Sequence, residues 1–494
     1  MKALRLLRGL FRLAKYALVF ALGGLVVLLL GDLLYSSGLR ELRPWETAEL
    51  RNEFHAGMPN EPRTFADYMA LEDRLFGEVK ALERRSFDPQ LDATLSRYDP
   101  AGSMLAKRLA HDWNRSYILH AQPERAVALL VHGLSDSPYS LRSIALALQA
   151  EGVTAYGLRL PGHGTIPAGL DQAAWQDWMA AVQMALDDIR ARHPSLPLYY
   201  IGYSTGATLG LKAAAEAIEQ GRAERLPARM FLISPALGVS PVAMLANLQQ
   251  LVTDFGIAQK SRWTNIDLEI DPFKYSSFAK NAGAQIYDLT VALAGELRTL
   301  DRSGLAARLP PVMSFQSLVD DTVSTDAVVN RLYGVLRGGK SELVLFDVNR
   351  IEGLRPFLDF SPQALLDATR RGERSDYRLT LITNSGPDSA DVIEQSWMPG
   401  QAASTTHPIP YAWPQGIYSL SHLALPFAAN DPIYGYDAQG PNGRLRTLGN
   451  LELRGERNVL ALSAADRLRL RSNPFYGYLI QRITSRIAED LDHR

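Results

Sequence analysis

Five short apolar runs, each followed by a longer stretch with helical character, constrain the fold of this chain more than any other feature. The runs are 126–131, 153–158, 198–201, 230–233 and 312–315. Strands that are apolar along their whole length are typical of a parallel sheet with both faces covered, and parallel strands need long crossover connections. The pattern therefore predicts an α/β fold, with a mostly parallel sheet flanked by helices.

Composition limits the classes of partner and of chemistry. With 494 residues the chain can form a large core and still carry insertions. Its 52 basic and 53 acidic side chains give no bias toward a polyanion, so we expect no nucleic-acid partner. The chain has no cysteine, which excludes disulfides, thiolate metal sites and a cysteine nucleophile but leaves the compartment open.

The N-terminal region predicts a membrane segment. Five cations, Lys2, Arg5, Arg8, Arg12 and Lys15, precede an apolar run over 16–30 that continues to residue 35. About twenty helical residues would cross a hydrocarbon core of roughly 30 Å, and flanking cations favour the cytoplasmic side. We therefore predict an uncleaved single-pass anchor with the catalytic domain on the far side, in a periplasmic or extracellular location. A cleaved signal peptide, although 34–38 has no clear cleavage motif, and a buried soluble helix are the alternatives.

Residues 41–120 have a helical pattern, and their sequence contains no set of residues typical of a catalytic site. One apolar stripe runs among charged residues, and its members are Phe65, Met69, Leu75, Phe76, Val79 and Leu82. A stripe of this spacing is typical of a helix that packs one face on a neighbouring domain. We interpret this region as a helical arm between the membrane and the catalytic domain.

The motif Gly202-Tyr203-Ser204-Thr205-Gly206 lies between an expected strand and an alanine-rich helix over 207–218. A serine on a sharp strand-to-helix turn needs glycines two residues away on both sides, because a Cβ there would collide with the neighbouring strand and helix. The positive end of the helix would favour an anion at the same place. This context indicates that Ser204 is a nucleophile; a serine that merely caps the helix is the alternative.

A second motif, Val131-His132-Gly133-Leu134, ends the first strand and resembles the His-Gly turn of α/β-hydrolases. The resemblance implies an oxyanion hole formed by the backbone amides of Leu134 and Thr205. His132 is expected to be structural, because that family uses a later histidine as its base. The turn over 159–165 also resembles the family, and His163 there is expected to be structural or to line the substrate site.

The resemblance also implies an acid after the strand over 312–315. The family pattern fits Asp320, with Ser317 and Val323 in register, although Asp321 remains an alternative one position away. The acid would hold the imidazole in one tautomer and stabilise the imidazolium. A helix N-cap is the other interpretation of Asp320, but neighbouring hydroxyl residues can fill that role.

The family order of serine, acid and then histidine leaves three candidates for the base. His493 is next to the C-terminus, and His407 lies in a polar, proline-rich segment that we interpret as a loop. His422 is bracketed by apolar residues over 418–426. Its Leu-Ser-His segment is similar to that of bacterial serine aminopeptidase and monoacylglycerol lipase-like hydrolases. We therefore predict a catalytic triad of Ser204, Asp320 and His422.

The interval between the predicted acid and base is longer than is common in that family. Strand-like runs at 343–346 and 379–382, with a helical stretch near 361–371, predict a βαβ-like insertion there. The predicted organisation is a membrane anchor at 1–40, an arm at 41–120, a first core half at 121–240, a cap at 241–309, and a second core half at 310–494 with an insertion near 340–415 and a C-terminal extension.

These elements predict a serine hydrolase that cleaves ester-type bonds through an acyl-enzyme, without a metal or an organic cofactor. An acyltransferase and a serine aminopeptidase remain alternatives on the same triad. A non-catalytic binding protein of the same fold is the alternative from another class, although binding alone would not need the full set of groups. The oligomeric state stays open.

A lipid or other small acyl ester is the expected substrate, because apolar side chains recur in the predicted cap. They are Leu245, Leu248, Leu251, Val252 and Phe255, followed by Phe273, Tyr275, Phe278 and Tyr287. An apolar cap over Ser204 would favour an acyl chain. The alternative is that these side chains simply pack on the domain beneath them.

Overall fold

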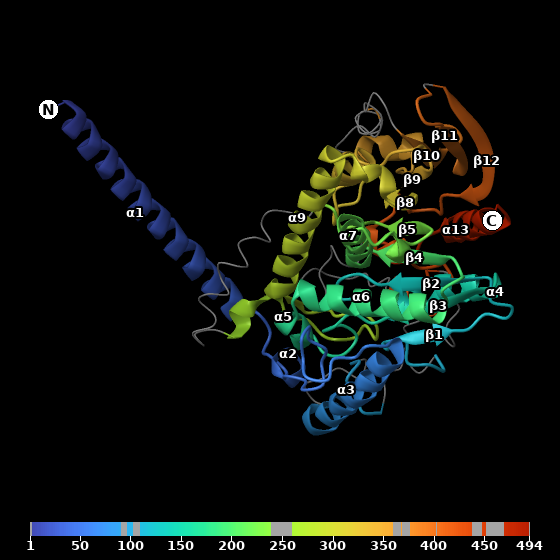
Figure 1. Cartoon of the computed structure of the whole chain (residues 1–494). Helices are drawn as coiled ribbons and strands as arrows, with labels where there is room; N and C mark the ends of the chain where they lie inside the picture. The colour runs from blue at the N-terminus through green and yellow to red at the C-terminus, as the bar shows by residue number, and fades with distance from the viewer. Residues whose placement is uncertain are drawn as a thin grey trace.

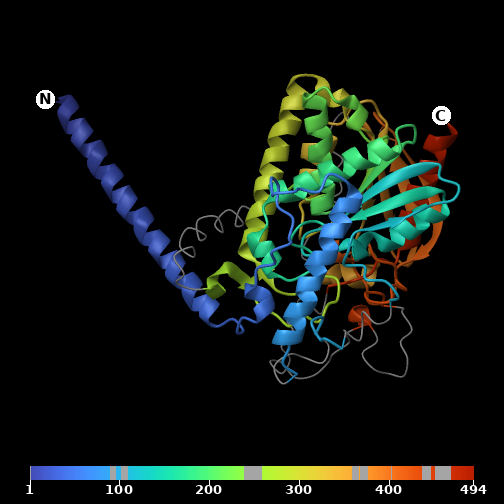
Figure 2. The same cartoon turned by 60° about the horizontal axis from the view of Figure 1, so that its bottom comes forward.

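The computed structural model describes residues 2–89, 96–101, 109–238, 259–358, 367, 376–401, 403–436, 447–450 and 469–493. A single ten-stranded sheet forms the centre of the molecule, and helices cover both of its faces (Figure 1). Helix α1 projects away from this body in both views (Figures 1 and 2).

The sheet has the strand order β1-β3-β2-β4-β5-β8-β9-β10-β11-β12. Neighbouring strands from β3 to β10 are parallel, whereas β1, β11 and β12 pair antiparallel. The bounds are β1 Tyr117–Leu119, β2 Ala126–Val131, β3 Val153–Leu158, β4 Leu198–Tyr203, β5 Arg229–Ile233, β8 Val312–Ser317, β9 Ser341–Phe346, β10 Tyr377–Asn384, β11 Asp391–Trp397 and β12 Ser404–Ala412. A two-stranded sheet pairs β6 Trp263–Asn265 with β7 Phe278–Ala279. All five predicted strands are confirmed, and they form the middle of the sheet.

The helices form two layers. Their bounds are α2 Pro44–Thr47, α3 Phe65–Ser86, α4 Arg142–Ala150, α5 Ala168–Gln172, α6 Trp175–Arg192, α7 Thr205–Glu219, α9 Lys280–Arg302, α10 Thr325–Ala327 and α13 Tyr476–Asp492. Alternate side chains of a strand point to opposite faces. Leu129 of β2 accordingly packs in the core with α3, α6, α7 and α9, and its neighbour Leu130 packs in the core with α4 and α13. Burial of both faces explains why the strands are apolar throughout.

The arm helix α3 is built as its sequence indicates. Thr64 caps its N-terminus by accepting a hydrogen bond from the amide of Asp67, whose carboxylate accepts from the amide of Thr64 in return. The predicted stripe is buried except for the partly buried Met69. Glu72 of this helix also pairs at 2.8 Å with Arg159, a fully buried residue that follows β3. The arm is therefore joined to the core by packing and by a buried ion pair.

The two strand-like runs predicted between the acid and the base, at 343–346 and 379–382, form strands β9 and β10. β9 and β10 pair in parallel, as a βαβ unit requires, whereas the expected helix lies outside the described residues apart from Asp367. The interpretation of the segment around His407 as a loop is wrong, because it forms strand β12 at the edge of the sheet. Its side chains are mostly exposed and include Pro408 and Pro410, so it lacks the apolar pattern of a core strand.

The predicted cap is described only in its second part. Its first five apolar side chains, between 245 and 255, lie outside the described residues. Helix α9 lies along α7 (Figure 1), where Lys212 of α7 pairs with Glu296 of α9 at 2.5 Å. Phe273 and Tyr275 are 3% and 4% exposed, which fits the interpretation that these two rings pack on the domain beneath them.

Helix α1, Lys2–Ser37, contacts the body only near its C-terminal end among the described residues. There Asp32 pairs with Lys280 at 2.5 Å, and the hydroxyl of Tyr35 donates to the carbonyl of Thr264. Many of its large apolar side chains are exposed, including Phe11 and Phe20. In the part of the chain that the structure describes, we find no helix that is both long and apolar enough to cross a membrane. The structure thus does not support the single-pass anchor predicted for residues 1–40.

Candidate active site

Ser204 occupies the sharp turn between β4 and α7. Its backbone has a φ of 52° and a ψ of −113°, a strained conformation for a residue with a side chain. A Cβ on Gly206 would overlap the carbonyl oxygen of Val131, and one on Gly202 would lie 2.5 Å from the Cα of Ala207. The predicted need for both glycines is confirmed. The serine side chain makes no hydrogen bond that caps the helix, so the capping interpretation is not supported.

The His-Gly turn lies directly against this serine. A Cβ built on Gly133 would be 3.1 Å from the Cβ of Ser204. Strands β2 and β4 pair in parallel, so Leu134, which follows β2, and Thr205, which follows β4, lie at the same edge of the sheet. Thr205 is the first residue of α7, and the amide of a first helical residue has no acceptor within the helix. Its amide can therefore bind an anion.

The two histidines expected to be structural are fully buried. The Nε2 atom of His132 accepts from the amide of Leu160 at 3.0 Å, so its Nδ1–H donates to the carbonyl of Gly133. Burial holds the pKa of His132 well below its usual value. His163 bonds the carbonyl of Pro161, and burial lowers the pKa of His163 to about 3. Both rings are therefore neutral and hold the turns that follow β2 and β3.

The structure brings His422 and Asp320 together. The Nδ1 atom of His422 lies 2.9 Å from Oδ2 of Asp320, and both side chains are buried. The amides of Thr322 and Val323 donate to the other carboxylate oxygen. Burial alone would raise the pKa of Asp320, but the charge and hydrogen bond of His422 and these amides hold it below its usual value. Asp321 is exposed and has no such contact among the described residues.

The histidine loop is fixed beside the serine turn. The hydroxyl of Ser317, at the end of β8, donates to the carbonyl of Leu420 at 2.8 Å. Tyr203, the residue before Ser204, donates from its hydroxyl to the carbonyl of His422, and the two rings lie 5.3 Å apart. The rival histidines are elsewhere: His407 is exposed on the edge strand β12, and His493 is exposed at the end of α13.

Two polar side chains near the serine turn had no role in the sequence prediction. Asp136, in the turn after β2, accepts from Nζ of Lys274 at 3.2 Å. The amide of Tyr275 also donates to the carbonyl of Ser135, so the segment around 274 is bonded directly to the turn. Asp136 lies two residues after Leu134 of the His-Gly motif, and nothing in the sequence indicated a partner so far downstream.

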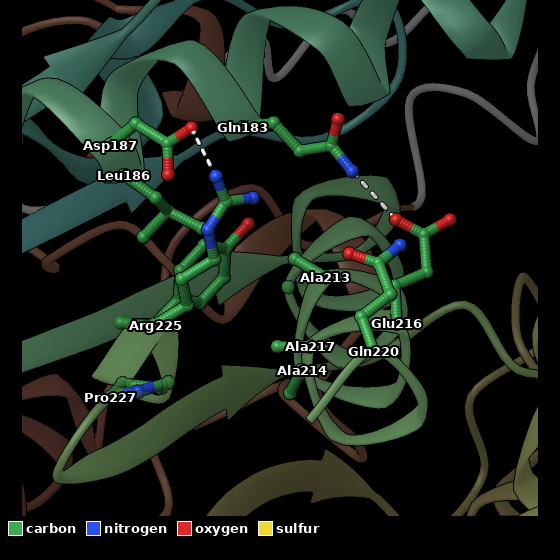
Figure 3. Close-up of a pocket in the computed structure, with 12 residues that line it drawn as sticks. Gln183, Leu186, Asp187, Ala213, Ala214, Glu216, Ala217, Gln220, Arg225 and Pro227 are labelled. Carbon is green, nitrogen blue, oxygen red and sulfur yellow. Dashed lines mark hydrogen bonds and ion pairs between the residues drawn. The ribbon is translucent and has the colours of Figure 1, made fainter. Parts of the chain in front are cut away.

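A small polar cavity lies apart from the candidate site. This cavity of about 20 Å³, between α6 and α7 (Figure 3), has room for about one water. Four polar side chains line this cavity in two pairs: Asp187 pairs with Arg225, and Gln183 donates a hydrogen bond to Glu216. The cavity lies toward the C-terminal end of α7, away from Ser204 at the N-terminal end of that helix. Among the described residues, no group of three or more His, Cys, Asp or Glu side chains has the arrangement to hold a metal ion.

Residues 122–271 match the family described as serine aminopeptidase, S33. A thermostable monoacylglycerol lipase from Bacillus sp. (strain H-257) is 35% identical over 86 residues, which cover 17% of this chain and 34% of that protein. The chain thus matches about a third of the length of this curated relative.

Two solved structures are also similar. One, of a metagenome-derived lipolytic enzyme, is 21% identical with a TM-score of 0.38 and covers 52% of this chain and 98% of the other. The monoacylglycerol lipase of Paleococcus ferrophilus is 20% identical with a TM-score of 0.36, and the match covers 47% of this chain and 87% of that lipase. The family match and the mostly parallel sheet confirm the predicted α/β-hydrolase fold. They also support a serine hydrolase of the lipase or esterase type.

Proposed function

We propose that this chain is a serine hydrolase that cleaves ester bonds through a triad of Ser204, His422 and Asp320. One observation carries the proposal. The buried carboxylate of Asp320 binds the imidazole of His422, and the carbonyl of His422 accepts a hydrogen bond from Tyr203, the residue before the strained Ser204. The order of these groups along the chain, with the acid between serine and histidine, is typical of this fold. Binding alone would require none of this arrangement.

The reaction follows from the roles of these groups. Because Nδ1 of His422 bonds Asp320, the Nε2 atom is available to take the proton of Ser204. The alkoxide attacks the ester carbonyl, and the amides of Leu134 and Thr205 stabilise the tetrahedral oxyanion. His422 then protonates the leaving alcohol, and the acyl group stays on the serine. Water, deprotonated by the same imidazole, releases the acid and restores the enzyme.

The low pKa of Asp320 supports this cycle. A carboxylate that is ionised at neutral pH can stabilise the imidazolium that forms in each half-reaction. Its two backbone hydrogen bonds hold it in one orientation, and so fix the tautomer of His422. Asp320 is therefore ionised and correctly oriented before the substrate binds.

We expect the substrates to be monoacylglycerol-like or medium-chain esters rather than aminoacyl amides. The apolar residues between 245 and 255, in the position where this fold inserts its cap, suit an acyl chain. The similarity to a monoacylglycerol lipase favours the same class.

A substrate series tests this expectation. We expect kcat/KM for p-nitrophenyl esters to rise from acetate to a medium chain and to exceed that for aminoacyl anilides, with Ser204→Ala as the blank. A preference for anilides, or a steady fall from acetate onward, would contradict the lipid substrate and leave the serine hydrolase standing. Added alcohols or amines that become acylated faster than water would instead identify an acyltransferase.

We also propose that α1 attaches the protein to a lipid bilayer. The helix is apolar on much of its exposed surface, with Phe11 75% and Phe20 84% exposed, and cations precede the apolar run. Such a helix gains free energy when lipid covers its apolar side chains. An anchored enzyme would also meet acyl substrates at a high local concentration.

The orientation predicted from the sequence places the catalytic domain outside the cytoplasm. Protease added to intact spheroplasts should then digest the catalytic domain, while a cytoplasmic marker protein stays intact. A variant without residues 1–35 should move from the membrane pellet to the supernatant. Protection of the catalytic domain until lysis would refute the orientation, and a full-length chain that stays in the supernatant would refute attachment.

A further inference from the structure

Strand β8 carries a buried amide side chain that the proposed mechanism does not use. Gln316 is 0% exposed and lies one residue before the end of a strand whose side chains are all buried. Its neighbours Met313 and Phe315 follow the apolar pattern of a strand that is covered on both faces. Glutamine is seldom fully buried, because each polar atom that leaves water needs a partner. Gln316 therefore interrupts the apolar pattern at the end of β8 that leads to Asp320.

The amide nitrogen of Gln316 donates to two oxygen atoms. Nε2 lies 3.1 Å from Oδ2 of Asp320 and 3.3 Å from Oγ1 of Thr325. The hydroxyl of Thr325 donates in turn to the carbonyl of Ser317 at 2.9 Å, so its oxygen is left to accept from Gln316. In the reversed orientation of the amide, Oε1 would face a carboxylate oxygen and the two would repel. These contacts fix the orientation of the side chain.

The carbonyl end of the same side chain has no partner. Oε1 of Gln316 is closed to solvent and accepts no hydrogen bond from the residues that the structure describes. A buried acceptor without a donor destabilises a fold, and an apolar side chain of similar length would avoid this loss. Packing of β8 thus gives no reason for an amide at this position, whereas the contact with Asp320 does.

Gln316 adds a fourth donor to the carboxylate of Asp320. The amides of Thr322 and Val323 donate to Oδ1. Nδ1 of His422 and Nε2 of Gln316 both lie within hydrogen-bond distance of Oδ2, at 2.9 and 3.1 Å. Two donors on one oxygen fix its position. They also share its negative charge, because a hydrogen bond stabilises the charged form of its acceptor.

We infer that Gln316 is a positioning residue of the proposed triad, which fixes Oδ2 of Asp320 toward His422 and reduces the negative charge that this oxygen presents to the imidazole. The inference rests on the proposed function, which assigns Asp320 and His422 their roles. An imidazole acts as a base only after it has lost its proton, and a more negative Oδ2 retains that proton to a higher pH. Gln316 therefore extends the activity of His422 as a base toward lower pH.

Further charged or titratable groups lie around this acid–base pair. They are Asp136 after β2, Tyr203 of β4, Asp321 beside the acid, and Arg469, which donates to the hydroxyl of Thr322. Gln316 is neutral, so its replacement by another neutral side chain leaves the charges of these groups as they are. A changed pH profile in such a variant then reports the loss of the Gln316 donor.

The test measures the rate at which a fluorophosphonate probe labels Ser204 as a function of pH, because labelling needs the free imidazole but no deacylation. Gln316→Met keeps the length of the side chain and removes the donor. We expect the midpoint of its acid limb to move at least about 0.5 pH unit higher than in the unmodified protein. Ser314→Ala is the matched control, since this serine is buried two residues earlier in β8 and its hydroxyl has no partner among the described residues. Its midpoint should stay unchanged.

A second pair of variants decides the question if Gln316→Met does not fold. Thr325→Val removes the other acceptor of the Gln316 amide, so its midpoint should move in the same direction by a smaller step. Thr325→Ser keeps the hydroxyl and should restore the profile of the unmodified protein. Melting temperatures within a few degrees of that protein identify the folded variants.

The outcomes separate this inference from the proposed function. An unchanged midpoint in folded Gln316→Met, or a move to lower pH, would overturn the inference. A lower plateau rate at the original midpoint would overturn it as well, because Gln316 would then only support the packing of β8. Absence of labelling at Ser204 in the unmodified protein would instead reject the proposed function, and the inference with it.

Discussion

Replacing Ser204 with alanine is expected to lower ester turnover by at least about 10³-fold and to abolish labelling by a fluorophosphonate probe. The change removes the only atom that can form the acyl-enzyme in the proposed mechanism. Ser204 makes no capping hydrogen bond with α7, so the variant should keep its fold. Ester hydrolysis, gel-based labelling and circular dichroism measure the three effects.

His422→Ala should cause a loss of the same order, and the double variant should be hardly worse than either single one. The groups of a triad act as a unit, because the serine is a poor nucleophile once its base is gone. His407→Ala is the matched control, since this exposed histidine lies on the edge strand. Losses that multiply in the double variant would show that Ser204 and His422 act independently, and the triad assignment would then be wrong.

The centre of the fold could be predicted because its strands are buried on both faces. Leu129 and Leu130 of β2 face different helical layers, and both must be apolar. The same reasoning applies to β3, β4, β5 and β8. Such runs differ from amphipathic helices in length and in composition, so the sequence indicates them without knowledge of their partners.

The sheet edge could not be predicted in the same way. In β12 most side chains are exposed, and Pro408 and Pro410 would argue against a strand in the interior of a sheet. At an edge they are tolerated, because one side of the strand has no partner to bond. Whether a segment lies at an edge depends on the order of the strands, which the local pattern of residues does not contain.

The parts of the candidate site that depend on contacts within one turn of the chain could be predicted from the sequence. Gly202 and Gly206 prevent collisions within one turn, and their spacing carries that information. The contact between Asp136 and Lys274 depends on how a distant segment lies against the turn, and no spacing encodes it. The N-terminal helix is a third case: its composition predicted a membrane-spanning anchor, but no helix among the described residues is both long and apolar enough to cross a bilayer.

The second large effect on activity is expected from replacing the acid of the triad, and it distinguishes Asp320 from Asp321. We expect Asp320→Asn to lower kcat at least tenfold more than Asp321→Asn, with a loss that can approach about 10⁴-fold. The asparagine amide would donate to Nδ1 of His422, so the imidazole would carry its proton on Nε2. That nitrogen could then no longer accept the proton of Ser204. Asp321 is exposed and its replacement should leave the tautomer unchanged.

Stability measurements separate this effect from unfolding. Asp320 also accepts from the amides of Thr322 and Val323, and an asparagine oxygen can keep these bonds. The melting temperature of Asp320→Asn should therefore fall by only a few degrees, while kcat collapses. Because the tautomer is set before the substrate binds, kcat and kcat/KM should fall together. A larger loss in Asp321→Asn would mean that the exposed carboxylate moves to the imidazole during catalysis, and the acid would have to be reassigned.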